Sequence, residues 1–342
     1  MIENISLKTR ILLPLALVLA ILLGAFHYTL YQHGKTDTAH RFMSDLKSAQ
    51  TYYQRTLERR GEKMGAVLEA ILRDEQLRAA LRARDRKALF ERAAPMFQKL
   101  RDQYGISHFY FEDAARVNVL RVHQPERHGD IINRHTTLAA EKTGKISIGA
   151  ELGPFGTFTL RAVAPLSDSN GLVGYIELGE EIEGALQGIQ AIIGANYLLT
   201  IDQQFLKRKD WENGMHMLGR DADWDRLPGM VVVQQTLDLP RDQAIRLLSD
   251  GSHPDSIMEL TVGDKRYHSS SIPVEDVSGR KVGKLTILSD TTQSINEMHA
   301  AMRSLSLFFL VLGGTLIASF YLITHRVGRR LDEAHLKSIN QG

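Results

Sequence analysis

The chain has 342 residues, a formal net charge of +2 and no cysteine. Its length allows two or three domains. Without cysteine it has no disulfide, thiolate metal site or cysteine nucleophile, and its nearly balanced charge, with no basic patch carrying interleaved aromatic residues, gives no indication of nucleic-acid binding.

The first apolar run is at residues 11–31, after a short segment (1–10) that contains Lys8 and Arg10. About 21 residues without a formal charge are enough to cross a bilayer as a helix. A cleaved signal peptide is the alternative, but such peptides have shorter apolar cores and a small-residue cleavage site. We therefore expect an uncleaved membrane helix at 11–31.

Residues 32–73 predict a long helix. Apolar residues recur there at intervals of three, four or seven, which places them on one helical stripe. This stripe could cover a sheet or pack on a partner helix. Its members are Phe42, Leu46, Ala49, Tyr53, Leu57, Met64, Leu68 and Ile71. Residues 76–105 predict two further helices with a break near Arg84–Asp85.

Four strand-like runs follow, at 108–112, 117–123, 157–165 and 172–179. Alternate side chains of a strand lie on opposite faces of a sheet. In each run one face is apolar and the other carries histidine, tyrosine, arginine, threonine or glutamate. We expect an antiparallel sheet whose apolar face packs on a helix.

A short helix is expected between the second and third runs. Thr136 or Thr137 can cap it, Glu141 lies in its body and Gly144 ends it. Residues 153–156 are expected to form a hairpin turn.

The polar faces of these runs supply the candidate site. Arg121 and Arg161 occupy equivalent faces of two central strands, and a buried arginine needs a carboxylate or a ligand anion. Glu151 and Glu177 are the chain's own candidate partners. The full candidate set is Tyr110, Arg121, His123, Asp130, Arg134, Glu151, Thr159, Arg161, Tyr175 and Glu177.

Three interpretations of this face stay open. It can bind a small polar ligand that carries a carboxylate or phosphate, with or without an amine. It can be an internal Arg–Glu network that only fixes the sheet. It can also be a solvated face, as antiparallel sheets often have.

Metal and catalytic chemistry are not expected. His123, His128, His135 and Asp130 match no zinc spacing. Glu180 and Glu181 are adjacent, so they point apart on a strand and make a poor acid–base pair; we expect them to begin a connecting helix. With no nucleophile–base pair in view, the sequence predicts no cofactor and no enzyme activity.

A second set of strands is predicted at 197–201, 230–234, 257–261, 265–272 and 281–288, with a short helix at 242–249. The connection 207–228, which carries both tryptophans, reads as a long loop.

The run 304–324 is a second uncharged span and is followed directly by arginines, as Lys8 and Arg10 flank the first. By the positive-inside rule both ends are cytoplasmic, which places 32–303 outside the membrane. The tail 325–342 reads as the start of a helical signalling linker without its output domain.

A resemblance covers most of the chain between the two spans. Six motifs occur in one order: HFYF (108–111), RVNVLRVHQPERHGD (116–130), INRHT (132–136), AEKTGK (140–145), ELGPFGTFTLRAVAP (151–165) and GYIELGEEI (174–182). Weaker likeness runs through 210–228 to about residue 292. Together they resemble the double Cache sensor domain, third subfamily, of bacterial transmembrane receptors.

The resemblance implies an α+β fold in which a long N-terminal helix supports two tandem antiparallel-sheet Cache modules between two transmembrane helices. The membrane-distal module (74–189) would bind a small molecule and the membrane-proximal one (190–292) would pass on the change. It also implies a bacterial inner-membrane homodimer that controls a diguanylate cyclase, histidine kinase or chemotaxis output.

Two other functional classes remain. A membrane-anchored module that binds a periplasmic protein would be favoured by a flat polar face. An extracytoplasmic enzyme would need a buried acid–base pair.

Overall fold

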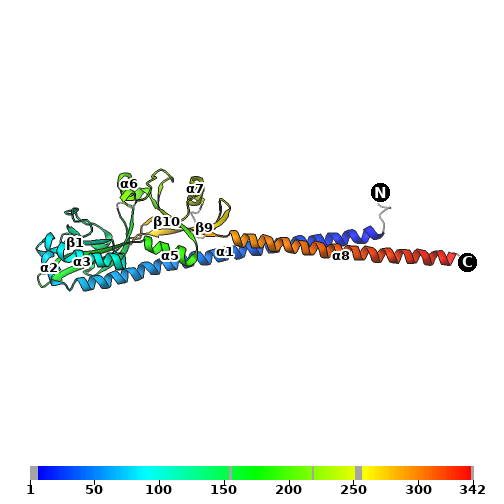
Figure 1. Ribbon diagram of the computed structural model, residues 1–342, viewed down its shortest axis with the longest axis horizontal. Coiled ribbons are helices and arrows are strands. Elements are labelled where there is room, and N and C mark those ends of the chain that lie inside the picture. The colour runs from blue at the N-terminus through cyan, green and yellow to red at the C-terminus, as the bar shows by residue number, and fades with distance from the viewer. Residues whose placement is uncertain (1–6, 154–155, 218, 251–255, 340–342) are drawn as a thin grey trace. The chain divides into compact units, whose positions relative to one another are not determined.

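The computed structural model describes residues 7–153, 156–217, 219–250 and 256–339. The chain divides into two compact units, one formed by Met1–Arg41 with Thr291–Gly342 and the other by Phe42–Asp290. Helix α1 (Leu7–Ile71) contributes to both, and helix α8 (Thr292–Ile339) belongs to the first (Figure 1).

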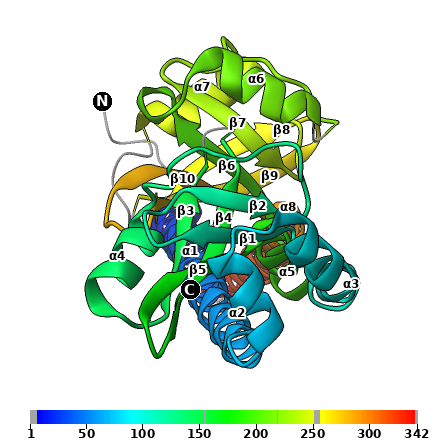
Figure 2. The ribbon, with the colours of Figure 1, turned by 90° about the vertical axis from the view of Figure 1, so that its left-hand side faces the viewer.

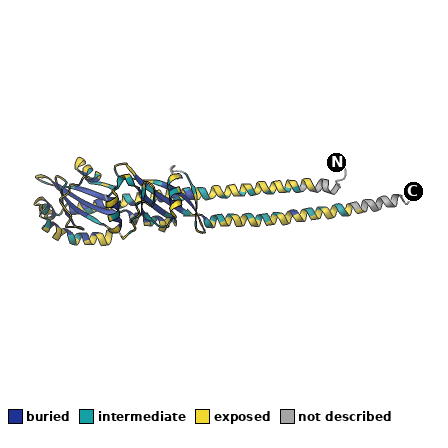
Figure 3. Cartoon of the chain, turned by 90° about the horizontal axis from the view of Figure 1, so that it is seen from above, coloured by how far each residue is buried: buried dark blue, intermediate teal, exposed yellow. Residues whose placement is uncertain are grey.

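The first unit consists of helix α8 and the part of α1 that ends at Arg41. Both helices are long and apolar enough to cross a membrane by length and composition, as the runs 11–31 and 304–324 predicted. Most of their side chains are exposed (Figure 3). The two helices contact each other through the edge-on rings of Phe26 and Phe309, 5.7 Å apart, and through a 2.9 Å hydrogen bond between His27 Nε2 and Ser306 Oγ.

The second unit contains two five-stranded antiparallel sheets. The first has the order β2-β1-β5-β4-β3. Its strands are β1 (His108–Asp113), β2 (Asn118–Arg121), β3 (Ser147–Leu152), β4 (Phe158–Asp168) and β5 (Gly171–Glu181). The four predicted strands are confirmed. Strand β3 was not predicted, because SIGAEL has a central glycine and no clean alternation of buried and exposed residues.

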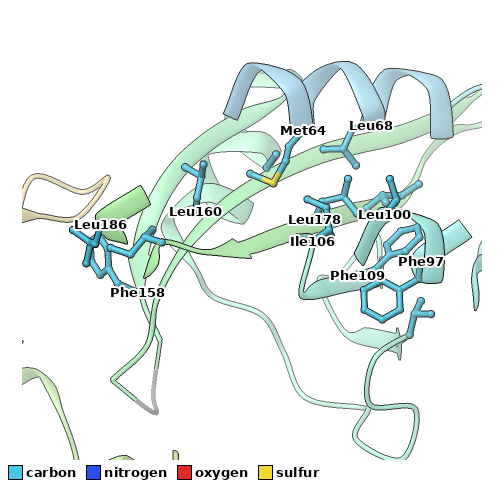
Figure 4. Close-up of a cluster of buried hydrophobic side chains, with 14 of the residues drawn as sticks. Met64, Leu68, Phe97, Leu100, Ile106, Phe109, Phe158, Leu160, Leu178 and Leu186 are labelled. Atoms are coloured by element: carbon cyan, nitrogen blue, oxygen red, sulfur yellow. The ribbon is translucent and has the colours of Figure 1, made fainter. Parts of the chain in front are cut away.

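The apolar face of the first sheet packs on helices, as expected. Met64 and Leu68 of α1 lie over Leu160 and Leu178, and Phe97, from helix α3 (Arg86–Tyr104), meets Phe109 (Figure 4). Burying side chains of this size stabilises the fold by about 1.5–3 kcal/mol each. Helices α2 (Glu75–Arg82) and α3 (Arg86–Tyr104) are separated at Arg84, whose positive φ of 50° interrupts the helix where the sequence predicted a break.

Helix α4 (His135–Thr143) lies on the polar face, where Ala140 packs with Val163 and Tyr175. Gly144 ends it in the left-handed region at φ 64°, as predicted. The expected cap by Thr136 or Thr137 is wrong. Both threonines lie inside the first turn, and the Glu151 carboxylate on β3 accepts the Thr136 N–H at 2.7 Å instead. The carboxylate of Glu151, distant in the sequence, thus satisfies a free N–H group at the start of α4 in place of a local capping side chain.

The second sheet has the order β7-β6-β10-β9-β8. Its strands, all five as predicted, are β6 (Asn196–Asp202), β7 (Met230–Gln235), β8 (Met258–Val262), β9 (Lys265–Glu275) and β10 (Lys281–Asp290). Helix α7 (Arg241–Asp250) also matches its prediction. Figure 2 shows α7 and a further helix, α6 (Arg208–Met217), together beside this sheet.

Two sequence predictions in this half are wrong. The supposed loop 207–228 contains helix α6 (Arg208–Met217), formed because Trp211 and Met215, four residues apart, are buried on one face. Glu180 and Glu181 do not begin a helix: they end β5, because the strand pairing continues as far as Glu181, which lies opposite Thr159. The connecting helix α5 (Glu183–Ile193) starts beyond them.

Candidate ligand-binding site

The strand register arranges the polar face of the first sheet in rows. Tyr110 lies between Arg121 and Glu177 in one row. In the next, Gly179 lies between His108 and Arg161. A Cβ at Gly179 would come within 3.1 Å of His108 Cβ and Thr159 Cγ2. This glycine therefore allows His108 and Thr159 to pack closely over the middle of the polar face.

A pocket of about 350 Å³ lies over this face. That volume is in the range of small-molecule sites. Five of the ten candidate residues line it: Tyr110, Arg121, His123, Arg134 and Arg161. The other lining residues, which sequence analysis did not assign to the site, are Ser107, His108, Gln124, Arg127, Gly153, Thr157, Glu181 and Gly214.

A buried ionic network forms the base of the pocket. Arg134 Nη1 donates to both Glu177 oxygens, at 2.6 and 2.8 Å, and Arg161 Nη1 also donates to Glu177, which is fully buried. Arg161 Nε lies 3.6 Å from Glu151. Burial opposes ionisation of Glu177, but the charges of Arg134 and Arg161 outweigh it and hold its pKa below the usual value.

Arg121 belongs to a second, more open pair. It donates to both oxygens of Asp130 at 2.7 Å and to the Arg127 carbonyl at 2.8 Å. Arg121 is buried whereas 47% of the Asp130 side chain is exposed. The hydrogen bonds from Arg121 lower the pKa of Asp130. This pair fixes the guanidinium at the pocket wall. The prediction that Arg121 lies on a central strand is wrong, because β2 is an edge strand of the sheet.

Aromatic rings complete the wall. The guanidinium carbons of Arg121 and Arg134 each lie 5.0 Å from the Tyr110 ring centroid. The His123 ring stacks on Tyr110 at 5.2 Å and meets His108 edge-on at 4.8 Å. Burial and the charge of Arg121 lower the pKa of His123 to about 4, and burial and Arg161 lower that of His108. Both rings are therefore neutral at pH 7.

Four of the remaining five candidates stand behind the pocket lining. Glu151, Glu177 and Asp130 hold the arginines and the start of α4, and Thr159 Oγ1 hydrogen-bonds to Glu181 at 3.3 Å. The fifth, Tyr175, is buried beneath α4 with Ala140 and Val163, so it does not form a pocket wall.

Two of the missed residues could have been found from strand parity. His108 shares a strand face with Tyr110, and Glu181 shares one with Glu177 once the predicted strand is extended by two residues. One more carboxyl, that of Glu112, lies fully buried between Asn118 and Tyr175. Neither of its oxygens has a hydrogen-bond partner among the described residues. Burial and the charge of Glu177 raise its pKa well above the usual value.

The comparison with protein families decides the assignment. A family model described as the double sensory domain of two-component sensor kinases matches residues 43–295. The chain belongs to this double Cache family. The resemblance given by the sequence motifs and the α+β fold with two antiparallel sheets are thereby confirmed. No curated protein sequence matches the chain.

The chain is similar to several solved sensor domains at low sequence identity. The Vibrio cholerae histidine kinase DctB sensor domain is 14% identical, with 75% of this chain and 98% of that chain covered and a TM-score of 0.41. The periplasmic domain of V. cholerae LuxQ is 12% identical, with 71% and 98% covered and a TM-score of 0.42. The ligand-binding domain of Campylobacter jejuni chemoreceptor Tlp3, crystallised with 4-methylisoleucine, is 10% identical, with 71% and 94% covered and a TM-score of 0.33.

Proposed function

We propose that this double Cache protein senses a small anionic or zwitterionic molecule, which binds in the pocket on the polar face of the first sheet. The observation that carries the proposal is the lining of the pocket: four arginines, two neutral histidines and a tyrosine, with Glu181 as the one carboxylate among the described lining residues. Guanidinium groups held by fixed carboxylates are preorganised donors for a carboxylate or phosphate. Glu181 offers a partner for an amine.

The ten candidate residues divide by role in this proposal. Arg121, Arg134, Tyr110 and His123 contact the ligand. Arg161, Glu177 and Glu151 hold the base of the pocket, and Asp130 orients Arg121. Thr159 orients Glu181, while Tyr175 supports α4.

The same proposal gives the protein its place in the cell. The basic flanks of the two apolar helices favour cytoplasmic termini and an extracytoplasmic segment 32–303, in the inner membrane of a bacterium. Module 74–189 would bind the ligand and module 190–292 would relay the change to a cytoplasmic kinase, cyclase or chemotaxis output. Two chains would form the signalling unit, and the segment 43–295 would have no catalytic activity of its own.

Thermal unfolding of the full chain in lipid nanodiscs tests the proposal. Tryptophan fluorescence follows unfolding while di- and tricarboxylates, phosphorylated metabolites and amino acids are added in turn. A compound that binds the folded state raises the unfolding midpoint by mass action. We expect at least one compound of these classes to do so, and neutral sugars not to.

Two arginine variants locate the site. Arg127 is an exposed pocket residue, so Arg127→Ala should fold normally and lose most of the ligand-induced shift. Arg82, which pairs with Asp168 away from the pocket, is the matched control, and Arg82→Ala should keep the shift. Equal responses of the two variants would reject the pocket assignment. A protein stabilised by none of these compounds would favour the protein-interaction function instead.

A further inference from the structure

One wall of the pocket comes from the second half of the chain. All lining residues but one lie between Ser107 and Glu181; the exception is Gly214, in helix α6. Gly214 is buried and has no side chain, so a molecule in the pocket can reach the α6 backbone itself. The site is therefore not built by the first sheet alone.

Helix α6 is held at the pocket by its buried face. Trp211, one turn before Gly214, is 1% exposed, and Met215 is fully buried. Trp211 packs directly on Gly156, which lies two residues before the start of β4. A Cβ atom added at Gly156 would lie 2.4 Å from Trp211 Cδ1. Gly156 also has a φ of 76°, in the region that favours glycine. The contact of α6 with the β3–β4 hairpin therefore depends on a buried tryptophan in the helix and on a glycine in the hairpin.

Helix α6 is equally fixed to the second sheet. It follows strand β6 after a single 3₁₀ turn, η1 (Gln203–Phe205). The Gln203 N–H donates to the Gly229 carbonyl at 2.9 Å, and its side chain donates to the Trp224 carbonyl at 2.8 Å. Trp224 meets Trp211 edge-on at 5.6 Å. A displacement of α6 would therefore be carried into η1 and β6.

A second contact joins the same hairpin to the second sheet but does not reach the pocket. The Val277 N–H, in the β9–β10 turn, donates to the Ala150 carbonyl at 2.8 Å, and its side chain covers Gly149. Neither Val277 nor Ala150 lines the pocket. Of these two contacts, α6 is the one that a bound ligand can touch.

We propose that α6 is a ligand-contacting wall of the pocket, and that occupancy by an anion acts on the second sheet through Gly214 and Trp211. The inference rests on the proposed function, because it takes this pocket as the ligand site. A ligand group that lies beside Gly214, between the arginines, displaces the α6 backbone. Trp211 is on the same face of α6, so its contact with Gly156 changes as well.

The chain is suited to a direct test, because it has no cysteine and two tryptophans. In a full-length Trp224→Phe background, Trp211 is the sole fluorophore of its kind. Gly214→Cys is then reacted with two methanethiosulfonates of similar size, one carrying an ethylsulfonate and one an ethyltrimethylammonium group. The disulfide formed with the first tethers an anion inside the pocket, so the probe needs no knowledge of the natural ligand.

We expect Gly214→Cys to react faster with the anionic reagent, by about 10-fold relative to the control, because four guanidinium groups line the pocket while most of their carboxylate partners lie behind the lining. We also expect the tethered sulfonate to shift the Trp211 emission. The matched control is Asn213→Cys, which is adjacent on α6 but exposed. It should show neither the charge preference nor the emission shift.

Equal reactivity of Gly214→Cys toward the two reagents, or an unchanged Trp211 emission after modification, overturns the proposal. If Gly214→Cys does not fold, Thr157→Cys tethers the sulfonate from the first sheet's side of the same pocket. The emission shift is expected there too, and its absence is equally decisive. A failed metabolite screen would reject the proposed function while leaving this outcome intact, so the two failures are distinguishable.

Discussion

The substitution Glu177→Gln tests the ionic network at the base of the pocket. Glu177 is fully buried and is the shared acceptor of Arg134 and Arg161. Without the Glu177 charge, Arg161, with 3% of its side chain exposed, keeps one anionic neighbour among the described residues, Glu151, which lies 3.6 Å from its Nε. Removing one partner of a buried ion pair costs about 3–5 kcal/mol, because the remaining charge is left desolvated and uncompensated. We expect a loss of that size in the free energy of unfolding.

Urea unfolding of the full chain in nanodiscs, followed by tryptophan fluorescence, measures this loss. Asp168→Asn is the matched control, since Asp168 pairs with the half-exposed Arg82 on the surface and should leave stability almost unchanged. Equal midpoints for the two variants would refute the argument, because they would show that the buried network contributes no more than a surface pair.

Four further predictions follow from other parts of the molecule. Glu112 is buried with a raised pKa, so its contribution to stability is present below the unfolded-state pKa of about 4.3 and is lost as the pH rises through the folded-state pKa. Glu112→Gln should therefore lose less unfolding free energy than the wild type between acid and neutral pH. Gly179→Ala would crowd His108 and Thr159 and should raise the ligand concentration needed for half-maximal thermal shift. A cysteine at the exposed Asn170 should react with a membrane-impermeant maleimide in intact cells, and protection there would contradict the proposed topology. Single cysteines along 33–50 should crosslink in native membranes with helical periodicity if two chains pair in parallel, and uniform absence of crosslinks would contradict the dimer.

Strand parity made much of the first sheet predictable. Phe109 and Phe111 alternate with Tyr110 and Glu112, and the structure buries the first pair in the core with α1 and α3. Such alternation fixes which side chains share a face before any partner strand is known. It is the reason that Arg121, Arg161 and Tyr110 could be brought together from the sequence.

What parity could not provide is the set of contacts made between distant segments. Glu151 caps α4 across the sheet, and the sequence offered only the local threonines for that role. Gly214 reaches the pocket from α6, about thirty residues beyond the last motif of the first sheet. Tyr175 has the right parity but is covered by α4, and the position of that helix is set by packing of Ala140. Local pattern determines a face, while tertiary packing decides which part of the face stays open.

The arginines of the polar face form two layers, and this changes how the site has to be tested. The sequence set two interpretations of Arg161 against each other, a ligand contact or a structural ion pair. In the structure Arg161 lines the pocket and is also paired with buried Glu177, so the two roles coexist in one side chain. Arg161→Ala is then expected to destabilise the fold whether or not a ligand binds. In contrast to Arg161, which is buried, Arg127 is an exposed lining residue of the pocket. Its loss should remove anion binding at little cost in stability, which makes it the variant that separates recognition from folding.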